Sequence, residues 1–205
     1  MGGIPKPAQV RLQKELLTIQ KNPIENIIVR PMESNLLVWY FVIFGPKNTE
    51  YENGEYFGVI LFERNYPFAP PNFKMFTPSG RFKPGDKICM SMTGFHKESW
   101  NPLWTISSML IGLVSYMVTD EMGTGTMSTT KSYKILKAKE SWTWNRDFNL
   151  FIDMYPERLG LEYTKTELTS AVIDEPAGDG LFVMKLAKFL ALLILPILFA
   201  TLFLN

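Results

Sequence analysis

The amino-acid sequence predicts an α+β fold, in which one helix is followed by a run of strands and then by further helices. Three observations predict it. Apolar residues recur at helical spacing near the N-terminus, β-branched and aromatic runs separated by turn signals follow, and helical spacing returns in the second half. Helices placed before and after a block of strands are typical of α+β domains. Consecutive strands joined by short turns predict an antiparallel meander.

The first helix is predicted from Pro7 to about Gln20, and Asn22-Pro23 ends it. Arg11 and Lys14 lie outside its apolar stripe, so we expect them on a solvated basic face. The apolar stripe consists of Leu12, Leu16 and Ile19.

A four-stranded antiparallel sheet is predicted next, with turn signals at Gly45-Pro46 and Asn53-Gly54. The proline-rich segment Tyr66–Pro71 lacks the N–H donors that a helix or a central strand needs, so we expect a stiff loop there. The predicted strands are Ile27–Arg30, Leu36–Phe44, Tyr56–Phe62 and Asn72–Phe76.

Two helices are predicted in the second half of the chain, at Ile106–Tyr116 and Ser132–Asn149. Between them Met122–Thr130 is rich in Gly, Ser and Thr, which indicates a loop. The first helix has an apolar core stripe formed by Ile106, Met109, Leu110 and Leu113, and the packing residues expected on the second are Tyr133, Leu136 and Trp142.

The C-terminal part of the sequence predicts a linker at 158–180 and a transmembrane tail at 181–205. Phe189–Leu204 carries no charge, and counted from Leu186 the apolar span is about 19 residues, roughly 28 Å as a helix. A buried core helix is the alternative. Lys185 and Lys188 flank the span, which predicts that the preceding residues face the cytosol. The span ends one residue before the sequence does, which predicts that insertion follows translation.

Composition excludes several kinds of site. The 205 residues carry a net charge of +1, which argues against a nucleic-acid footprint. One cysteine forms no internal disulfide, so a reducing compartment is expected. One Cys and one His do not supply a structural zinc site, so no metal is expected. No N-terminal signal peptide is recognisable.

The only cysteine, Cys89, lies close in sequence to the only histidine, His96. By themselves they are compatible with a small buried thiol or with a Cys/His hydrolase. Their flanking motifs resemble the core of ubiquitin-conjugating enzymes, most of all the tail-anchored branch that serves protein quality control at the endoplasmic reticulum. These motifs are Tyr66-Pro67-Phe68-Ala69-Pro70-Pro71, Thr77-Pro78-Ser79-Gly80-Arg81-Phe82, Ile88-Cys89-Met90-Ser91 and Trp100-Asn101-Pro102.

This resemblance covers about Pro7 to Glu157 and implies a catalytic domain at 1–157 with the ubiquitin-conjugating fold. It implies that Cys89 carries ubiquitin as a thioester, with no bound cofactor, and that ATP is used upstream by the activating enzyme. The implied partners are ubiquitin, the activating enzyme and a RING-type ligase. The positions implied for docking these partners are Arg11, Lys14, Pro67, Phe68 and Pro102. Alternatively, Phe68 is a buried core residue that plugs the hydrophobic core and docks no partner.

Two residues near Cys89 leave alternatives open. The family's His-Pro-Asn tripeptide, which reads Thr-Pro-Asn in the tail-anchored branch, is Thr77-Pro78-Ser79 here. Ser79 supports the oxyanion through a water, or another donor acts, or transfer to amines is weak, or Ser79 is only a turn residue. His96 is either an auxiliary base or a solvated loop residue.

The function that the resemblance implies is ubiquitin transfer in endoplasmic-reticulum-associated degradation. The enzyme would be anchored in that membrane by its tail, with its catalytic domain in the cytosol. The alternative is a catalytically weak or inactive binding module of the same fold, because Ser79 replaces the family's Asn.

Overall fold

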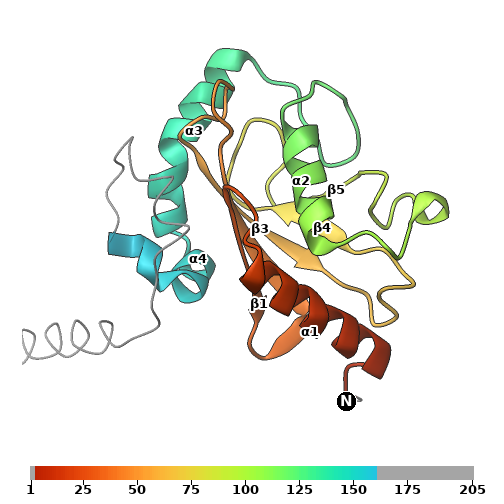
Figure 1. Cartoon of the computed structure of the whole chain (residues 1–205). Coiled ribbons are helices and arrows are strands. Elements are labelled where there is room, and N and C mark those ends of the chain that lie inside the picture. The colour runs from red at the N-terminus through yellow and green to blue at the C-terminus, as the bar shows by residue number, and fades with distance from the viewer. Residues whose placement is uncertain (1–2, 161–205) are drawn as a thin grey trace, which may run out of the picture. The chain divides into compact units, whose positions relative to one another are not determined.

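The computed structural model describes residues 3–160, and these form an α+β fold with a five-stranded antiparallel sheet (Figure 1). The strands lie side by side in chain order, β1-β2-β3-β4-β5, and each is antiparallel to the next. The predicted fold class and meander are therefore confirmed.

The sheet has one strand more than the four that were predicted. The four are β1 (Ile27–Met32), β2 (Asn35–Phe44), β3 (Glu55–Leu61) and β4 (Asn72–Met75). The fifth, β5 (Lys87–Ile88), pairs with Lys74 and Phe73 of β4. A strand of two residues is too short to show an alternating pattern, which is why the sequence did not predict it.

Helices α1 (Lys6–Lys21) and α2 (Ile106–Met117) bury their apolar stripes against one face of the sheet, as predicted (Figure 1). The other face is covered by α4 (Asn149–Met154) and by Tyr155. Alternate residues of β2 serve the two faces, because side chains alternate along a strand. Trp39, Phe41 and Ile43 belong to the first cluster, and Tyr40, Val42 and Phe44 to the second.

The helix predicted over Ser132–Asn149 is present as α3 (Lys131–Arg146), but it ends three residues earlier than predicted, and a separate helix, α4, begins at Asn149. Of the three residues expected to pack, Tyr133 and Leu136 are exposed and Trp142 is half-buried. The buried face of α3 is mainly polar, so the apolar residues of this helix do not mark the face that packs against the domain. That face consists of Lys134, Ala138, Ser141 and Asn145.

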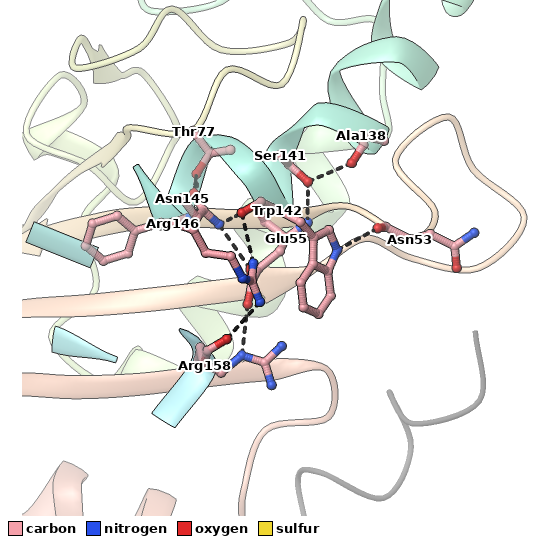
Figure 2. A network of polar contacts seen from close by, with 10 residues as sticks. Asn53, Glu55, Thr77, Ala138, Ser141, Trp142, Asn145, Arg146 and Arg158 are labelled. Atoms are coloured by element: carbon pink, nitrogen blue, oxygen red, sulfur yellow. Dashed lines mark hydrogen bonds and ion pairs between the residues drawn. The ribbon is translucent and has the colours of Figure 1, made fainter. Parts of the chain in front are cut away.

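Glu55, at the start of β3, is the centre of a buried polar network (Figure 2). Its carboxylate accepts hydrogen bonds from Arg158 Nε at 2.9 Å and from Asn145 Nδ2 at 3.4 Å, and Arg146 Nη1 lies 3.5 Å away. Asn145 Oδ1 in turn accepts from the Thr77 hydroxyl at 2.5 Å. The network thus joins the sheet, α3 and the loop after β4.

The predicted domain boundary at residue 157 would assign Arg158 to the linker, although Arg158 belongs to this network. Arg158 is 4% exposed and belongs to the short 3₁₀ helix η2 (Pro156–Gly160), so it is part of the fold rather than of a linker. The rest of the predicted linker and the predicted transmembrane tail lie outside the described residues. Within residues 3–160, no helix is both long and apolar enough to cross a membrane.

Candidate active site

Cys89 follows β5 directly and is half-buried. Its backbone N–H donates to Thr124 O at 2.9 Å, so the residue is held between the sheet edge and the loop that follows α2. A Cβ atom at Gly123 would lie 3.9 Å from the Cys89 Cβ and 2.9 Å from the Tyr116 hydroxyl. The absence of a side chain at Gly123 therefore leaves room beside the thiol.

Arg81 supports the wall of the site on the side of α2. Its guanidinium donates to the carbonyl oxygens of Tyr116 and Glu121, at 3.3 and 2.5 Å. The side chain is 1% exposed and fixes the end of α2 to the loop that follows it. The motif after Ser79 thus has a structural role that sequence reasoning did not assign.

His96 contacts the thiol: its Nε2 lies 3.1 Å from Cys89 Sγ. On the other side of the ring, Nδ1 lies 3.4 Å from Glu98 Oε1. The backbone N–H of Glu98 and the side chain of His96 lower the pKa of the Glu98 carboxyl. The imidazole is thus placed between a thiol and a carboxylate, while the His96 side chain remains 46% exposed.

The turn that carries His96 is braced by Thr93, whose side chain is fully buried. The Thr93 hydroxyl accepts from the Met90 N–H at 3.0 Å and donates to the Met90 carbonyl at 2.8 Å. The His96 N–H donates to Thr93 O at 3.0 Å, and the Ser99 hydroxyl donates to Ser91 O at 2.9 Å. These bonds fix the backbone on both sides of the imidazole. Sequence reasoning found His96 but neither Thr93 nor Glu98.

Ser79 lies in a buried turn. Its hydroxyl oxygen accepts hydrogen bonds from the backbone N–H groups of Arg81 and Phe82, both at 3.2 Å, and Gly80, which follows Ser79, has φ +73°. These are the bonds expected of a turn residue. A role for Ser79 in supporting the oxyanion stays a prediction.

The loop at Pro67 and the loop at Pro102 form one apolar surface. The indole N–H of Trp100 donates to Pro67 O at 2.8 Å and joins the two loops. Phe68 is 71% exposed, so the core-plug interpretation is wrong. Leu103 is 81% exposed and adds to this surface, although no sequence pattern indicated it.

Lys14 is exposed on α1 as expected, but the expected solvated position is wrong for Arg11. The Arg11 guanidinium donates to the carbonyl oxygens of Pro102 and Trp104, both at 2.7 Å. It also pairs with Glu15 at 2.7 Å, and the other Glu15 oxygen accepts from the first N–H of α2 at 3.2 Å. Arg11 therefore holds α1, the Pro102 loop and α2 together.

Among residues 3–160, no group of three or more His, Cys, Asp and Glu side chains is arranged to hold a metal ion.

A sequence profile described as "Ubiquitin-conjugating enzyme" matches residues 11–143. Ubiquitin-conjugating enzyme E2 6 of Schizosaccharomyces pombe is 44% identical over 153 residues, which cover 74% of this chain and 67% of the relative. Ubiquitin-conjugating enzyme E2 J2-like of Dictyostelium discoideum is also 44% identical, with 74% and 89% covered. Ubiquitin-conjugating enzyme E2 J2 of Homo sapiens is 40% identical, with 75% and 59% covered.

A solved structure of human ubiquitin-conjugating enzyme E2 G1 has a TM-score of 0.50 and 27% sequence identity to this chain. The match covers 57% of this chain and 98% of that one.

Proposed function

Because this chain belongs to the ubiquitin-conjugating enzyme family, a family of ubiquitin transferases, we propose that Cys89 is the residue that carries ubiquitin. The Cys89 thiolate attacks the thioester on the activating enzyme, and ubiquitin's C-terminal acyl group moves to Sγ. A RING-type ligase then brings a substrate that takes the acyl group. ATP is consumed upstream, in the activating enzyme.

The observation that carries this proposal is the position of the thiol. Cys89 is the only cysteine in the chain, and it stands half-buried at the sheet edge beside His96 and Gly123. A thiol that packs as a small core residue would be fully enclosed, whereas an acyl carrier needs one open side.

Charging with ubiquitin tests the proposal. The full chain is incubated with ubiquitin, activating enzyme and ATP, and we expect an adduct that a thiol reductant cleaves. Cys89→Ala should abolish it, whereas the matched Ser91→Ala, at an exposed neighbouring residue, should keep it. A reductant-sensitive adduct on the Cys89→Ala variant, or none on the natural chain, would contradict the assignment.

A second candidate function rests on Ser79, whose oxygen is occupied by two backbone N–H groups in place of the family's asparagine. In that case the domain presents ubiquitin or recruits partners and transfers ubiquitin poorly. A chain that charges but does not discharge in the presence of ligase and free lysine would favour this candidate.

We assign ligase and activating-enzyme docking to the apolar surface of Pro67, Phe68, Pro102 and Leu103, together with Lys14 on α1. The exposure of Phe68 and Leu103 supports this assignment, because large apolar side chains in neighbouring loops favour a protein partner. Arg11 contributes indirectly, since its guanidinium holds the Pro102 carbonyl and thereby the loop.

We further propose that the enzyme is tail-anchored in the endoplasmic reticulum membrane, with the catalytic domain in the cytosol, and acts in degradation of proteins from that compartment. The uncharged run Phe189–Leu204 and the flanking Lys185 and Lys188 support the anchor. The similarity of the motifs around Cys89 to the tail-anchored branch supports the compartment.

A further inference from the structure

We propose that His96 is a catalytic residue of ubiquitin discharge: it accepts the proton of the attacking acceptor group, and Glu98 positions its ring. The inference rests on the proposed thioester at Cys89. It is carried by the arrangement of sulfur, imidazole and carboxylate in sequence, with Sγ to Nε2 at 3.1 Å and Nδ1 to Oε1 at 3.4 Å.

The distance to the sulfur is what a base for this step requires. In the charged enzyme the carbonyl carbon is bonded directly to Cys89 Sγ, so a nucleophile that attacks this carbon arrives beside the His96 ring. A general base acts from hydrogen-bond reach of the proton that it abstracts. A side chain that is 46% exposed is also open to an acceptor arriving from solvent.

The second ring nitrogen determines which tautomer is present. A carboxylate facing Nδ1 favours the tautomer that carries its proton there, and this leaves the Nε2 lone pair directed at the reacting centre. Glu98 remains ionised because its own backbone N–H and the His96 side chain lower its pKa. The side chain of Glu98 is 76% exposed, so its contribution is orientation rather than a strong electrostatic field.

The braced backbone keeps the ring in place. Thr93 holds the Met90 N–H and carbonyl, and its own carbonyl accepts from the His96 N–H. A catalytic base on a solvated turn would otherwise have to order itself in each turnover. Preorganisation of this kind is expected of a functional site and is not needed for a solvated loop residue.

The step balances as follows. An acceptor amine or hydroxyl attacks the thioester carbonyl, its proton moves to His96 Nε2, and a tetrahedral oxyanion forms. The oxyanion collapses, the C–S bond breaks, and the Cys89 thiolate leaves. The imidazolium returns its proton to the sulfur 3.1 Å away, which restores the thiol and the neutral imidazole. The product is an amide or an ester of ubiquitin.

Single-turnover discharge tests the role of His96 separately from charging. The full chain is charged, the activating enzyme is stopped, and decay of the thioester is followed with free lysine and with N-acetylserine. His96→Gln should slow discharge to at least one acceptor by about 100-fold, the lower end of what a general base contributes. Lys97→Gln, at the exposed next residue, should stay within about twofold of the natural chain.

The pH dependence separates a base from a structural residue. At each pH, the discharge rate of the natural chain is divided by that of His96→Gln. Because both rates depend equally on the protonation of the acceptor, that dependence cancels in the ratio. The titratable groups in contact with His96 among the described residues are Cys89, which is esterified in this assay, and Glu98. We expect the ratio to fall towards one as pH decreases, because a protonated imidazole accepts no proton.

Glu98→Gln tests the positioning role. Without the carboxylate the ring loses the partner that orients it, so the plateau of the ratio profile should fall. Equal rates for the natural chain and His96→Gln with both acceptors, or a ratio that does not change with pH, would overturn the proposal. Failure of the proposed function would instead show as no reductant-sensitive adduct on any variant.

Discussion

Ser79 illustrates how one hydroxyl can fix the backbone of a buried turn. Its oxygen accepts the N–H groups of Arg81 and Phe82 inside a fully buried turn. The turn in turn places Arg81, whose guanidinium holds the end of α2 next to the thiol. The position that the family uses for an asparagine is therefore occupied here by a residue with a structural function.

Two substitutions at this position should have opposite outcomes. Ser79→Ala leaves two buried N–H groups without their acceptor and should lower the free energy of unfolding by about 1–3 kcal/mol. Ser79→Asn should largely retain stability, because an Asn side-chain oxygen accepts the same bonds in an Asx turn. Urea denaturation of residues 1–160 measures both. If the alanine variant is as stable as the natural chain, the turn bonds have no energetic role.

The asparagine variant also tests the oxyanion hypothesis. If a donor is needed at this position, Ser79→Asn should speed discharge to free lysine relative to the natural chain, since an amide offers two N–H donors where a hydroxyl offers one. The comparison is made by single-turnover decay of the thioester. Unchanged or slower discharge would count against any oxyanion role for residue 79.

Single residues whose partners are distant in sequence were the hardest to place. Arg11 was expected in solvent because it lies off the apolar stripe of α1, but its guanidinium binds two backbone carbonyls in a loop 91 and 93 residues later. Cys89 and His96 were singled out from the sequence, whereas their 3.1 Å contact depends on how the braced turn folds back. Composition and spacing contain no information on such contacts.

At the scale of elements, prediction succeeded where apolar periodicity is strong and failed where it is weak. The helices α1 and α2 and the strands β1 to β4 follow apolar patterns over several residues, and the structure has them. By contrast β5 has only two residues, and the buried face of α3 includes Lys134, Ser141 and Asn145. That face is buried by its polar network, which no hydrophobic pattern reveals.

Breaking the buried ion pair between Glu55 and Arg158 should lower the free energy of unfolding far more than breaking an exposed ion pair. Arg158→Met leaves a fully buried carboxylate with Arg146 at 3.5 Å as its nearest remaining cation, and should lower the free energy of unfolding by about 3 kcal/mol.

Lys137→Met, which breaks the exposed pair with Glu140, is the matched control and should cost less than about 1 kcal/mol. Chemical denaturation of both variants in residues 1–160 makes the comparison. Equal losses would mean that the η2 segment contributes little to the fold.

At the scale of the whole molecule, we expect membrane association and ubiquitin charging to depend on different parts of the chain. Removing residues 181–205 should release the protein from membranes while the remaining chain still charges with ubiquitin, because the match to the ubiquitin-conjugating family spans residues 11–143 and includes Cys89. Membrane flotation and the charging assay measure the two properties independently.

A point substitution sharpens the same test. Leu193→Arg places a charge near the middle of the apolar run and should weaken insertion by about 2.5–3.5 kcal/mol, whereas Lys188→Arg at its edge keeps the flanking charge and should insert normally. Membrane association that survives both the deletion and Leu193→Arg would show that another part of the chain binds the membrane.

The network at Glu55 also has a consequence for synthesis on the ribosome. The carboxylate is made early, and its guanidinium partners follow 91 and 103 residues later. A nascent chain that stalls before Arg158 therefore has all five strands but lacks the guanidinium that lies nearest to this carboxylate. Completion of this polar network is therefore a late event of translation.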